Sequence, residues 1–566
     1  MQLTPAYLGK SSINSSSGSR ILQLAPDLSR DRVSFDAPLT DPIRFREAIS
    51  ALHDVVINDL RFKPRDKSAY DDWRTQQRAS EAQIRAQAYQ EAKKEAEAHR
   101  GQPIAKTLEK DYKAAKGRYW KARRQLNSWL QENDKELWRK LMPYDPVITV
   151  ADDTVFFECF SADESSYGCL TVEREDCFGK TNEIALGTTN VDYSWDLYHH
   201  FQTLRSYRET RFSIDPAGFT VATESAPDYR EEKIDLPDGW LRGFMQMQSA
   251  MGMPMRKVPL SVSSVYSLLA FLKRRKAKTS PRAIRFELED GKAPRMVLEP
   301  WEQPIDSHGT TYSGPTGEAI RVWGRRRLLV LSRLLPLAEG VDVYLLGTGL
   351  PSFWVVRMGA MRLTLGLSGW TTNDWTRGSA IDMLMPDDPI SDTQVAAMSQ
   401  SLNDSRRASL ADLSKHLHMP TGTAAQSLNQ LALRGQAIYD LHAGCYRWRQ
   451  VLPMALSDKE LGPPHPERIG AAEILRKQQV RIESQEQGPR GGTILVGKAE
   501  NQPVEAMIDG DAIIRKGSCK CSYFYKYGIR NGPCRHIQAL RDAWRQGADN
   551  AASADWYDRL SRWAGR

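Results

Sequence analysis

Four residues near the end of the sequence have the types and the spacing of a metal site. They form two close pairs, Cys519-Lys-Cys521 and Cys534-Arg-His536, which twelve residues separate. Three thiolates and one imidazole complete the tetrahedral ligand set of a structural Zn²⁺, whereas a catalytic zinc keeps one position for water. We therefore predict a structural zinc site with the ligands Cys519, Cys521, Cys534 and His536.

The residues around these ligands must bring the two pairs together. Short apolar runs at 493–496, 505–508 and 512–515 predict strands before the first pair, and residues 537–545 predict a helix that begins at the second pair. A pair at a strand end and a pair at a helix start can reach one metal. We therefore expect a β-rich zinc module closed by a helix.

This arrangement, C-x-C and then C-x-H between β-strands and a helix, resembles the SWIM zinc finger. The resemblance implies the same four zinc ligands, and such fingers serve as DNA and as protein interaction modules. Motifs further upstream resemble the large bacterial SWIM proteins: Trp323-Gly-Arg-Arg-Arg, Gly347-Thr-Gly-Leu-Pro, Gly366-Leu-Ser-Gly-Trp370 and Asn373-Asp-Trp375. Because those proteins are often encoded beside a MoxR-type AAA+ ATPase and a von Willebrand factor A protein, the resemblance implies these two as partners.

Positive charge is concentrated around the predicted zinc site. The whole chain carries +8, from 78 Lys and Arg against 70 Asp and Glu, but residues 512–546 hold eight basic residues and one acid, a net +7. Cations follow phosphates, and exposed rings stack on unpaired bases. The candidate contacts to DNA or RNA are Lys516, Lys520, Lys526, Arg530, Arg535 and Arg541. The rings in the loop between the ligand pairs, at least two of which we expect in the zinc core, are Tyr523, Phe524, Tyr525 and Tyr527.

Residues 405–450 have the pattern of a winged helix-turn-helix, with helices at 409–417 and 423–433 and a two-stranded wing. In the usual mode the second helix enters the major groove. The predicted exposed positions of this helix are Thr423, Gln426, Ser427, Asn429, Gln430 and Arg434. The two that we select as nucleic-acid contacts are Gln426 and Arg434. A structural or protein-docking role for this module is the alternative.

The expected fold class is α+β multidomain, with a helical hairpin arm, a mixed α/β central region, the winged helix and the zinc finger. The predicted boundaries are 1–66 for an N-terminal segment, 67–145 for a long helical hairpin, 146–232 for a β-rich region, 233–390 for the central region, 391–455 for the winged-helix-like domain and 456–566 for the SWIM zinc finger domain.

Two stretches of the central region predict helices, residues 234–278 and residues 318–337. The first ends in the basic run Lys273-Arg-Arg-Lys-Ala-Lys278. Basic residues at a helix end complement the helix dipole, which is a sufficient structural reason for the run, and a nucleic-acid contact is the alternative.

The sequence predicts that the chain is not an enzyme, because it has no phosphate-binding loop, nucleophile elbow or H-E-x-x-H motif. It also shows no signal peptide or membrane-spanning run, so we expect a cytoplasmic protein without a membrane partner. The leading hypothesis is a zinc-stabilised adaptor that binds nucleic acid within a multi-protein bacterial system. The alternative is a purely protein-binding subunit of a MoxR-type AAA+ and von Willebrand factor A assembly.

Overall fold

The computed structural model describes most of the chain outside residues 58–145. The described residues are 12–16, 19–23, 33–57, 114, 146–161, 163–180, 184–190, 201–202, 204–207, 210–215, 218–222, 238–278, 281–369, 375, 381–384, 390–451, 465–487, 492–508 and 513–547. The chain divides into two compact units, Asp59–Met142 and the remainder. The helical hairpin predicted over 67–145 falls outside the described residues. The unit made of residues 1–58 and 143–566 has mixed α and β structure.

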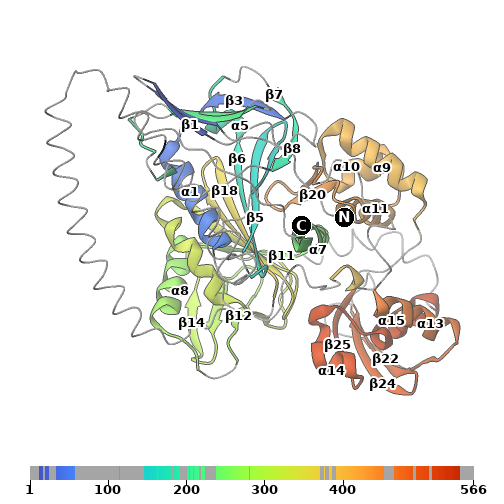
Figure 1. Cartoon of the computed structure of the whole chain (residues 1–566). Helices are drawn as coiled ribbons and strands as arrows, with labels where there is room; N and C mark the ends of the chain where they lie inside the picture. The colour runs from blue at the N-terminus through green and yellow to red at the C-terminus, as the bar shows by residue number, and fades with distance from the viewer. Residues whose placement is uncertain are drawn as a thin grey trace, which may run out of the picture. The chain divides into compact units, whose positions relative to one another are not determined.

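The largest element is an eight-stranded antiparallel sheet with the order β11-β16-β17-β18-β6-β5-β4-β8. Its strands are β4 (Val147–Val150), β5 (Thr154–Phe160), β6 (Ser166–Glu173), β8 (Gly187–Asn190), β11 (Arg256–Leu260), β16 (Gly340–Leu345), β17 (Ser352–Met358) and β18 (Met361–Leu367). Every residue of β5 and β18 is buried, including the charged residues Glu158 and Arg362. Helix α1 (Pro42–Val56), capped by Asp41, packs against β5, β6 and β18 (Figure 1).

Two smaller sheets belong to the same unit. One has the order β1-β2-β10-β9-β3-β7, with β1 (Ser12–Ser16), β2 (Ser19–Gln23), β3 (Ser34–Pro38), β7 (Ile184–Ala185), β9 (Arg211–Asp215) and β10 (Gly218–Ala222). The other has the order β14-β13-β12-β15, with β12 (Ile284–Glu287), β13 (Arg295–Leu298), β14 (Gln303–Asp306) and β15 (Ile320–Val322). A short helix, α5 (Arg174–Cys177), follows β6.

Both helical predictions for the central region need correction. The first stretch contains helices α7 (Asp238–Gly252) and α8 (Val262–Arg274), but strand β11 lies between them and forms an edge of the large sheet. Its alternating burial over five residues is a period-two pattern that the longer helical patterns on either side obscured.

The second stretch, residues 318–337, is not an α-helix. It consists of β15 and two 3₁₀ helices, η1 (Arg325–Arg333) and η2 (Leu335–Leu337). Gly324 separates strand from helix because its φ of 80° lies in the left-handed region, which glycine adopts without steric cost. Pro336 lacks the backbone N–H that a continuing helix requires.

Residues 391–451 form three helices and a three-stranded sheet with the order β19-β21-β20. The elements are α9 (Asp392–Ser405), β19 (Arg407–Ala408), α10 (Leu410–His416), α11 (Thr421–Leu433), β20 (Ala437–Asp440) and β21 (Cys445–Trp448). Strands β20 and β21 pair at the residues where the sequence predicts a two-stranded wing, and β19 pairs with the other edge of β21. Ser391 caps α9 through a reciprocal capping box with Gln394, which fixes where the module begins.

Helix α11 is enclosed on several sides, since it packs against α9, α10, α7 and β20. Gln426 is 6% exposed and Ser427 is fully buried, so the exposure predicted for these two residues is wrong. The physical reason is tertiary, because α11 packs against four other elements, one of which, α7, comes from a distant part of the sequence.

The last described residues form a β-meander with helices on it. The elements are α13 (Pro466–Arg476), β22 (Val480–Gln487), β23 (Thr493–Ala499), β24 (Gln502–Ile508), β25 (Ile514–Cys519), α14 (Ser522–Tyr527), η5 (Gly528–Asn531) and α15 (Arg535–Gly547). Residues between the ligand pairs, predicted as a loop, instead form the short helix α14 and the turn η5. We call residues 465–547 the C-terminal module.

Helix α15 lies on the four-stranded sheet and against α13. Two glycines permit this close approach: a Cβ on Gly497 would lie 2.8 Å from Leu540 Cδ1, and one on Gly517 would lie 2.8 Å from Ile537 Cδ1. The helix that ends the module is therefore held directly against the strands that precede the first ligand pair. Among the described residues, no helix combines the length and the apolar character needed to cross a bilayer.

Candidate metal centre

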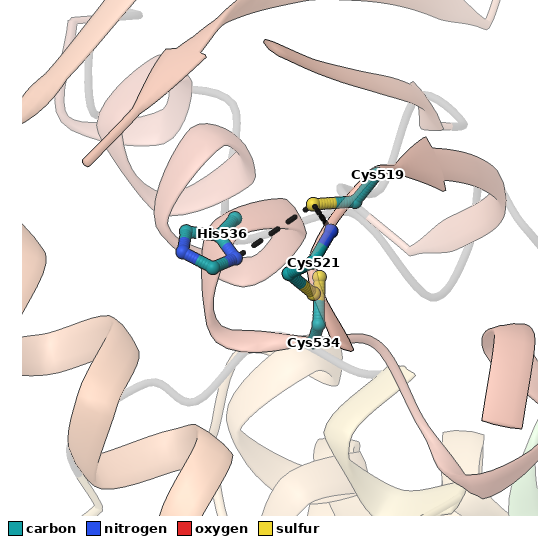
Figure 2. Close-up of side chains that lie close together, drawn as sticks. All are labelled: Cys519, Cys521, Cys534 and His536. Atoms are coloured by element: carbon teal, nitrogen blue, oxygen red, sulfur yellow. Dashed lines mark hydrogen bonds between the residues drawn. The ribbon is translucent and has the colours of Figure 1, made fainter. Parts of the chain in front are cut away.

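Each predicted ligand sits at the end of a regular element of the C-terminal module. Cys519 is the last residue of β25, Cys521 caps the N-terminus of α14, Cys534 directly precedes α15, and His536 lies in the first turn of α15. Their ligand atoms all lie within 4.8 Å of one another (Figure 2). The structure thus brings together the two pairs that the sequence selects.

One pair of ligand atoms has the spacing of a tetrahedral metal site. Zn–S bonds of about 2.3 Å and Zn–N bonds of about 2.0–2.1 Å at tetrahedral angles place the ligand atoms roughly 3.5–3.8 Å apart. Cys519 Sγ lies 3.7 Å from His536 Nδ1, which meets this requirement. The cluster could therefore hold a metal ion, and three sulfurs with one imidazole nitrogen form a donor set consistent with zinc.

Backbone N–H groups point at the sulfurs and favour their thiolate forms. The N–H of Cys521 donates to Cys519 Sγ at 3.5 Å, and the N–H of Phe524 donates to Cys521 Sγ at 3.4 Å. The N–H of Ile537 interacts with Cys534 in the same sense. Because a metal binds the thiolate and not the thiol, these bonds prepare the cluster for an ion.

The four groups also shift one another's titration. Hydrogen bonding from the Cys534 thiol lowers the pKa of Cys519 to about 4, although burial opposes this shift. The bond to Cys519 and burial raise the pKa of Cys534, and burial raises the pKa of Cys521. Burial alone would lower the pKa of His536, but its contacts with Cys519 and Glu500 raise it on balance. Cys519 is therefore the preferred thiolate of the cluster.

Glu500 contacts the cluster and was not selected by the sequence analysis. Its Oε2 lies 3.3 Å from His536 Nε2, while Nδ1 of the same ring faces Cys519. Metal-binding histidines commonly donate their second ring N–H to a carboxylate, which fixes the tautomer and the ring orientation. Glu500 can hold His536 in the orientation in which Nδ1 is the metal ligand.

The turn between β23 and β24 positions Glu500. Glu500 and Asn501 have φ values of 46° and 62° and connect the paired residues Ala499 and Gln502. Two successive positive φ values are typical of a type I′ hairpin turn, in which Asn is favoured and Glu is unusual. A Glu at a left-handed turn position is unusual. This is the one local indication that the Glu500 side chain is needed there, and it is visible only in the structure.

Three of the predicted nucleic-acid contacts are exposed around the metal centre. They are Lys516, Lys520 and Lys526. Tyr525 is 90% exposed, and Lys526 Nζ lies 4.9 Å from the ring centroid of Tyr527. Tyr523 and Phe524 are half-buried against the core, so part of the aromatic set packs the module, as expected.

Two other predicted contacts have internal partners. Arg541 is 2% exposed, and its guanidinium donates to the carbonyls of Met383 and Leu384, so it does not face solvent. Arg535 forms an ion pair with Glu467 at 2.8 Å. Burial alone would raise the pKa of Glu467, but Arg535 lowers it on balance.

The net charge of +7 over residues 512–546 therefore overstates the number of cations that can contact a nucleic acid. Arg515, which belongs to the same count, donates to the carbonyl of Leu346 at 3.4 Å, so a third arginine has an internal partner. The side chain of Arg530 lies outside the described residues.

The two contacts predicted on the winged-helix-like module are not brought to the metal centre. Gln426 is buried in α11, and Arg434, directly after α11, is half-buried. Arg449, which directly follows β21, forms a fully buried ion pair with Glu158 of β5, and Tyr167 donates to Glu158 at 2.6 Å. Removing one partner of such a pair costs several kcal/mol, on the order of 3–5, so the module is firmly attached to the large sheet.

No protein-family model matches the chain, and no curated protein matches its sequence. Among solved structures, it is similar to proliferating cellular nuclear antigen from Entamoeba histolytica, with 12% identity, a TM-score of 0.28 and coverage of 40% of this chain and 89% of that chain. For the C-terminal region of FEN-1 bound to A. fulgidus PCNA, the identity is 11% and the TM-score is 0.30, with coverage of 41% of this chain and 92% of that chain. For the PCNA2–PCNA3 complex from Sulfolobus tokodaii, the identity is 10% and the TM-score is 0.27, with coverage of 43% of this chain and 94% of that chain. Similarity at these TM-scores does not establish a shared fold.

Proposed function

We propose that this chain is a non-enzymatic, zinc-binding adaptor that binds nucleic acid through its C-terminal module. The observation that carries the proposal is the cluster of Cys519, Cys521, Cys534 and His536, whose ligand atoms lie within 4.8 Å. Four protein ligands leave no vertex for water, which is typical of a structural zinc site. Zinc bound there would tie the end of β25 to the start of α15, in agreement with the resemblance to SWIM zinc fingers.

Exposed side chains beside the cluster supply the binding surface. Ser522, Tyr525 and Lys526 are exposed on α14 at positions i, i+3 and i+4, so they share one face. The Tyr525 ring can stack on an unpaired base, while Lys520 and Lys526 interact with flanking phosphates. The surface therefore favours single-stranded nucleic acid over duplex.

The winged-helix-like module takes a structural role in this proposal. Its second helix, α11, is covered by α7, and the fully buried pair Arg449–Glu158 holds the module to the large sheet. A recognition helix must be free to enter the major groove. We therefore assign groove reading to neither Gln426 nor Arg434.

The test is a fluorescence-anisotropy titration of the zinc-loaded chain with single-stranded and duplex DNA and RNA over a series of salt concentrations. A variant with Gln at Lys516, Lys520 and Lys526 should bind more weakly and lose about 2–3 from the slope of log K against log salt. A matched variant with Gln at the exposed residues Lys292, Lys415 and Lys477 carries the same charge change and should bind like the wild type. Equal losses in both variants, or no binding at low salt, would contradict the proposal.

The second candidate function is a purely protein-binding subunit of a MoxR-type AAA+ and von Willebrand factor A assembly. The observation in its favour is that Arg515, Arg535 and Arg541 have internal partners, which leaves fewer cations for phosphates. This candidate predicts that the chain co-purifies with both partners and binds no nucleic acid at low salt. Failure to retain either partner would contradict it.

A further inference from the structure

A second concentration of positive charge lies at the end of helix α8, away in sequence from the C-terminal module. The helix ends at Arg274, and Arg275 beyond it has an extended backbone. We name the α8 basic ridge after its six exposed cations, which are Lys273, Arg274, Arg275, Lys276, Lys278 and Arg282. Residues 262–286 contain no acidic residue, so the ridge has no counter-charge in its own segment.

The rest of the described structure does not neutralise the ridge. None of its six cations forms an ion pair with a residue that the structure describes. The neighbouring helix η1 adds Arg326, whose guanidinium donates to the carbonyl of Leu272 at 3.3 Å. Burial, with repulsion from Arg282 and Arg326, lowers the pKa of Arg325 to about 10, although Glu299 opposes this shift. Cations therefore repel one another here.

The helix dipole accounts for only part of the ridge. Lys273 and Arg274 lie in the last turn of α8, where a cation interacts favourably with the dipole. This effect falls off within that turn. The other four cations lie beyond the end of the helix and gain little from it.

Stacking on aromatic rings holds part of the ridge in place. Arg275 lies over the ring of Phe271 at 5.4 Å, and Phe271 makes an edge contact with Trp301 at 5.1 Å. Arg325 lies over Trp301 at 5.0 Å. Such contacts restrain long side chains before a ligand arrives, so less conformational entropy is lost on binding.

We propose that the α8 basic ridge is a second nucleic-acid contact, which binds the sugar–phosphate backbone of DNA or RNA without reading its bases. Duplex DNA carries one charge per about 1.7 Å, and cations that neutralise its phosphates release condensed counterions. A surface of six unneutralised cations gains more from such a polyanion than from an acidic protein of lower charge density. The ridge shares no residue with the C-terminal surface, so either surface can fail without the other.

The test uses the full zinc-loaded chain, labelled 20-base single strands and duplexes of DNA and RNA, and anisotropy at several salt concentrations. A variant with Gln at Lys273, Arg274, Lys276 and Lys278 should lose up to about 3.6 from the slope of log K against log salt on duplex DNA, since each phosphate contact contributes about 0.9. The charge-conserving variant Lys273→Arg, Arg274→Lys, Lys276→Arg, Lys278→Arg should keep the slope. Thermal unfolding of both variants separates lost binding from lost folding.

Controls distinguish the ridge from general charge and from the C-terminal surface. A variant with Gln at Lys292, Lys415, Arg476 and Lys477 removes the same charge elsewhere and should keep the slope. The ridge variant should lose slope even in a background that already carries Gln at Lys516, Lys520 and Lys526. The proposal is overturned by an unchanged slope in the ridge variant or by an equal loss in the control. It is also overturned if polyglutamate competes with nucleic acid equally well per unit charge, because the surface would then fit an acidic protein.

Discussion

Replacement of Glu500 tests whether the metal centre extends beyond its four ligands. The carboxylate contacts His536 Nε2 at 3.3 Å from a turn that no ligand occupies. Glu500→Ala removes this acceptor and leaves all four ligands in the chain. Because Ala and Glu are both strained at a φ of 46°, the substitution does not relieve the backbone. Any loss of zinc affinity then reports the contact with His536.

The expected size follows from the geometry. Loss of an outer-shell partner typically lowers metal affinity by about 10–100-fold. The side chain of Glu500 is 40% exposed, so water replaces part of the lost interaction and the lower end applies. We expect Glu500→Ala to weaken zinc binding about tenfold, which corresponds to about 1.4 kcal/mol. Glu500→Gln should lose less, because its amide oxygen still accepts a hydrogen bond from the ring.

The assay is competition for zinc against a chromophoric chelator at constant pH, with circular dichroism to verify folding. Glu505→Ala is the matched control, since it removes an exposed carboxylate from strand β24 of the same module. Its zinc affinity should equal that of the wild type. The reasoning is refuted if Glu500→Ala binds zinc within twofold of the wild type, or if Glu505→Ala loses as much.

Four other predictions follow from the same structure. Cys534→Ala should abolish protease resistance of the C-terminal module, because structural zinc contributes on the order of 10 kcal/mol to folding; resistance equal to the wild type would contradict this. Tyr525→Ala should weaken single-strand binding by about 1–3 kcal/mol in anisotropy titrations, whereas Ser522→Ala on the same face should not. Arg541→Ala should lower the free energy of unfolding by about 1–3 kcal/mol in urea and leave nucleic-acid affinity unchanged, because the residue is buried. Burial alone would raise the pKa of Asp153, but Arg447 and Arg407 lower it on balance. The contribution of Asp153 to stability is therefore present above about pH 4 and is lost as the pH falls further. Asp153→Asn should flatten that loss in acid unfolding curves.

The zinc ligands could be selected from the sequence because their chemistry is local. Cys519 and Cys521 are two residues apart, and so are Cys534 and His536, so each pair reaches one point whatever the rest of the chain does. The strands and the helix around them also carry clear periodicity. Glu500 could not be found in this way, since its approach to His536 depends on a hairpin turn and on how α15 lies across the sheet.

The nucleic-acid residues show where charge counting fails. Ile537, Leu540, Arg541 and Trp544 recur at helical spacing on one face of α15, and the first three are buried. If this periodicity had been considered before the charge, it would have predicted that Arg541 lies on the buried face of α15. The burial of Gln426 had no such signal, because α11 is enclosed by tertiary contacts, including those with α7, which is far apart in sequence.

The most direct test of the central claim is zinc K-edge X-ray absorption of the purified full chain, with metal content measured on the same sample. The account predicts one zinc per chain with three sulfur ligands at about 2.3 Å and one nitrogen at about 2.0–2.1 Å. A spectrum that requires an oxygen ligand or fewer than three sulfurs, or a chain that retains no stoichiometric zinc, would contradict it.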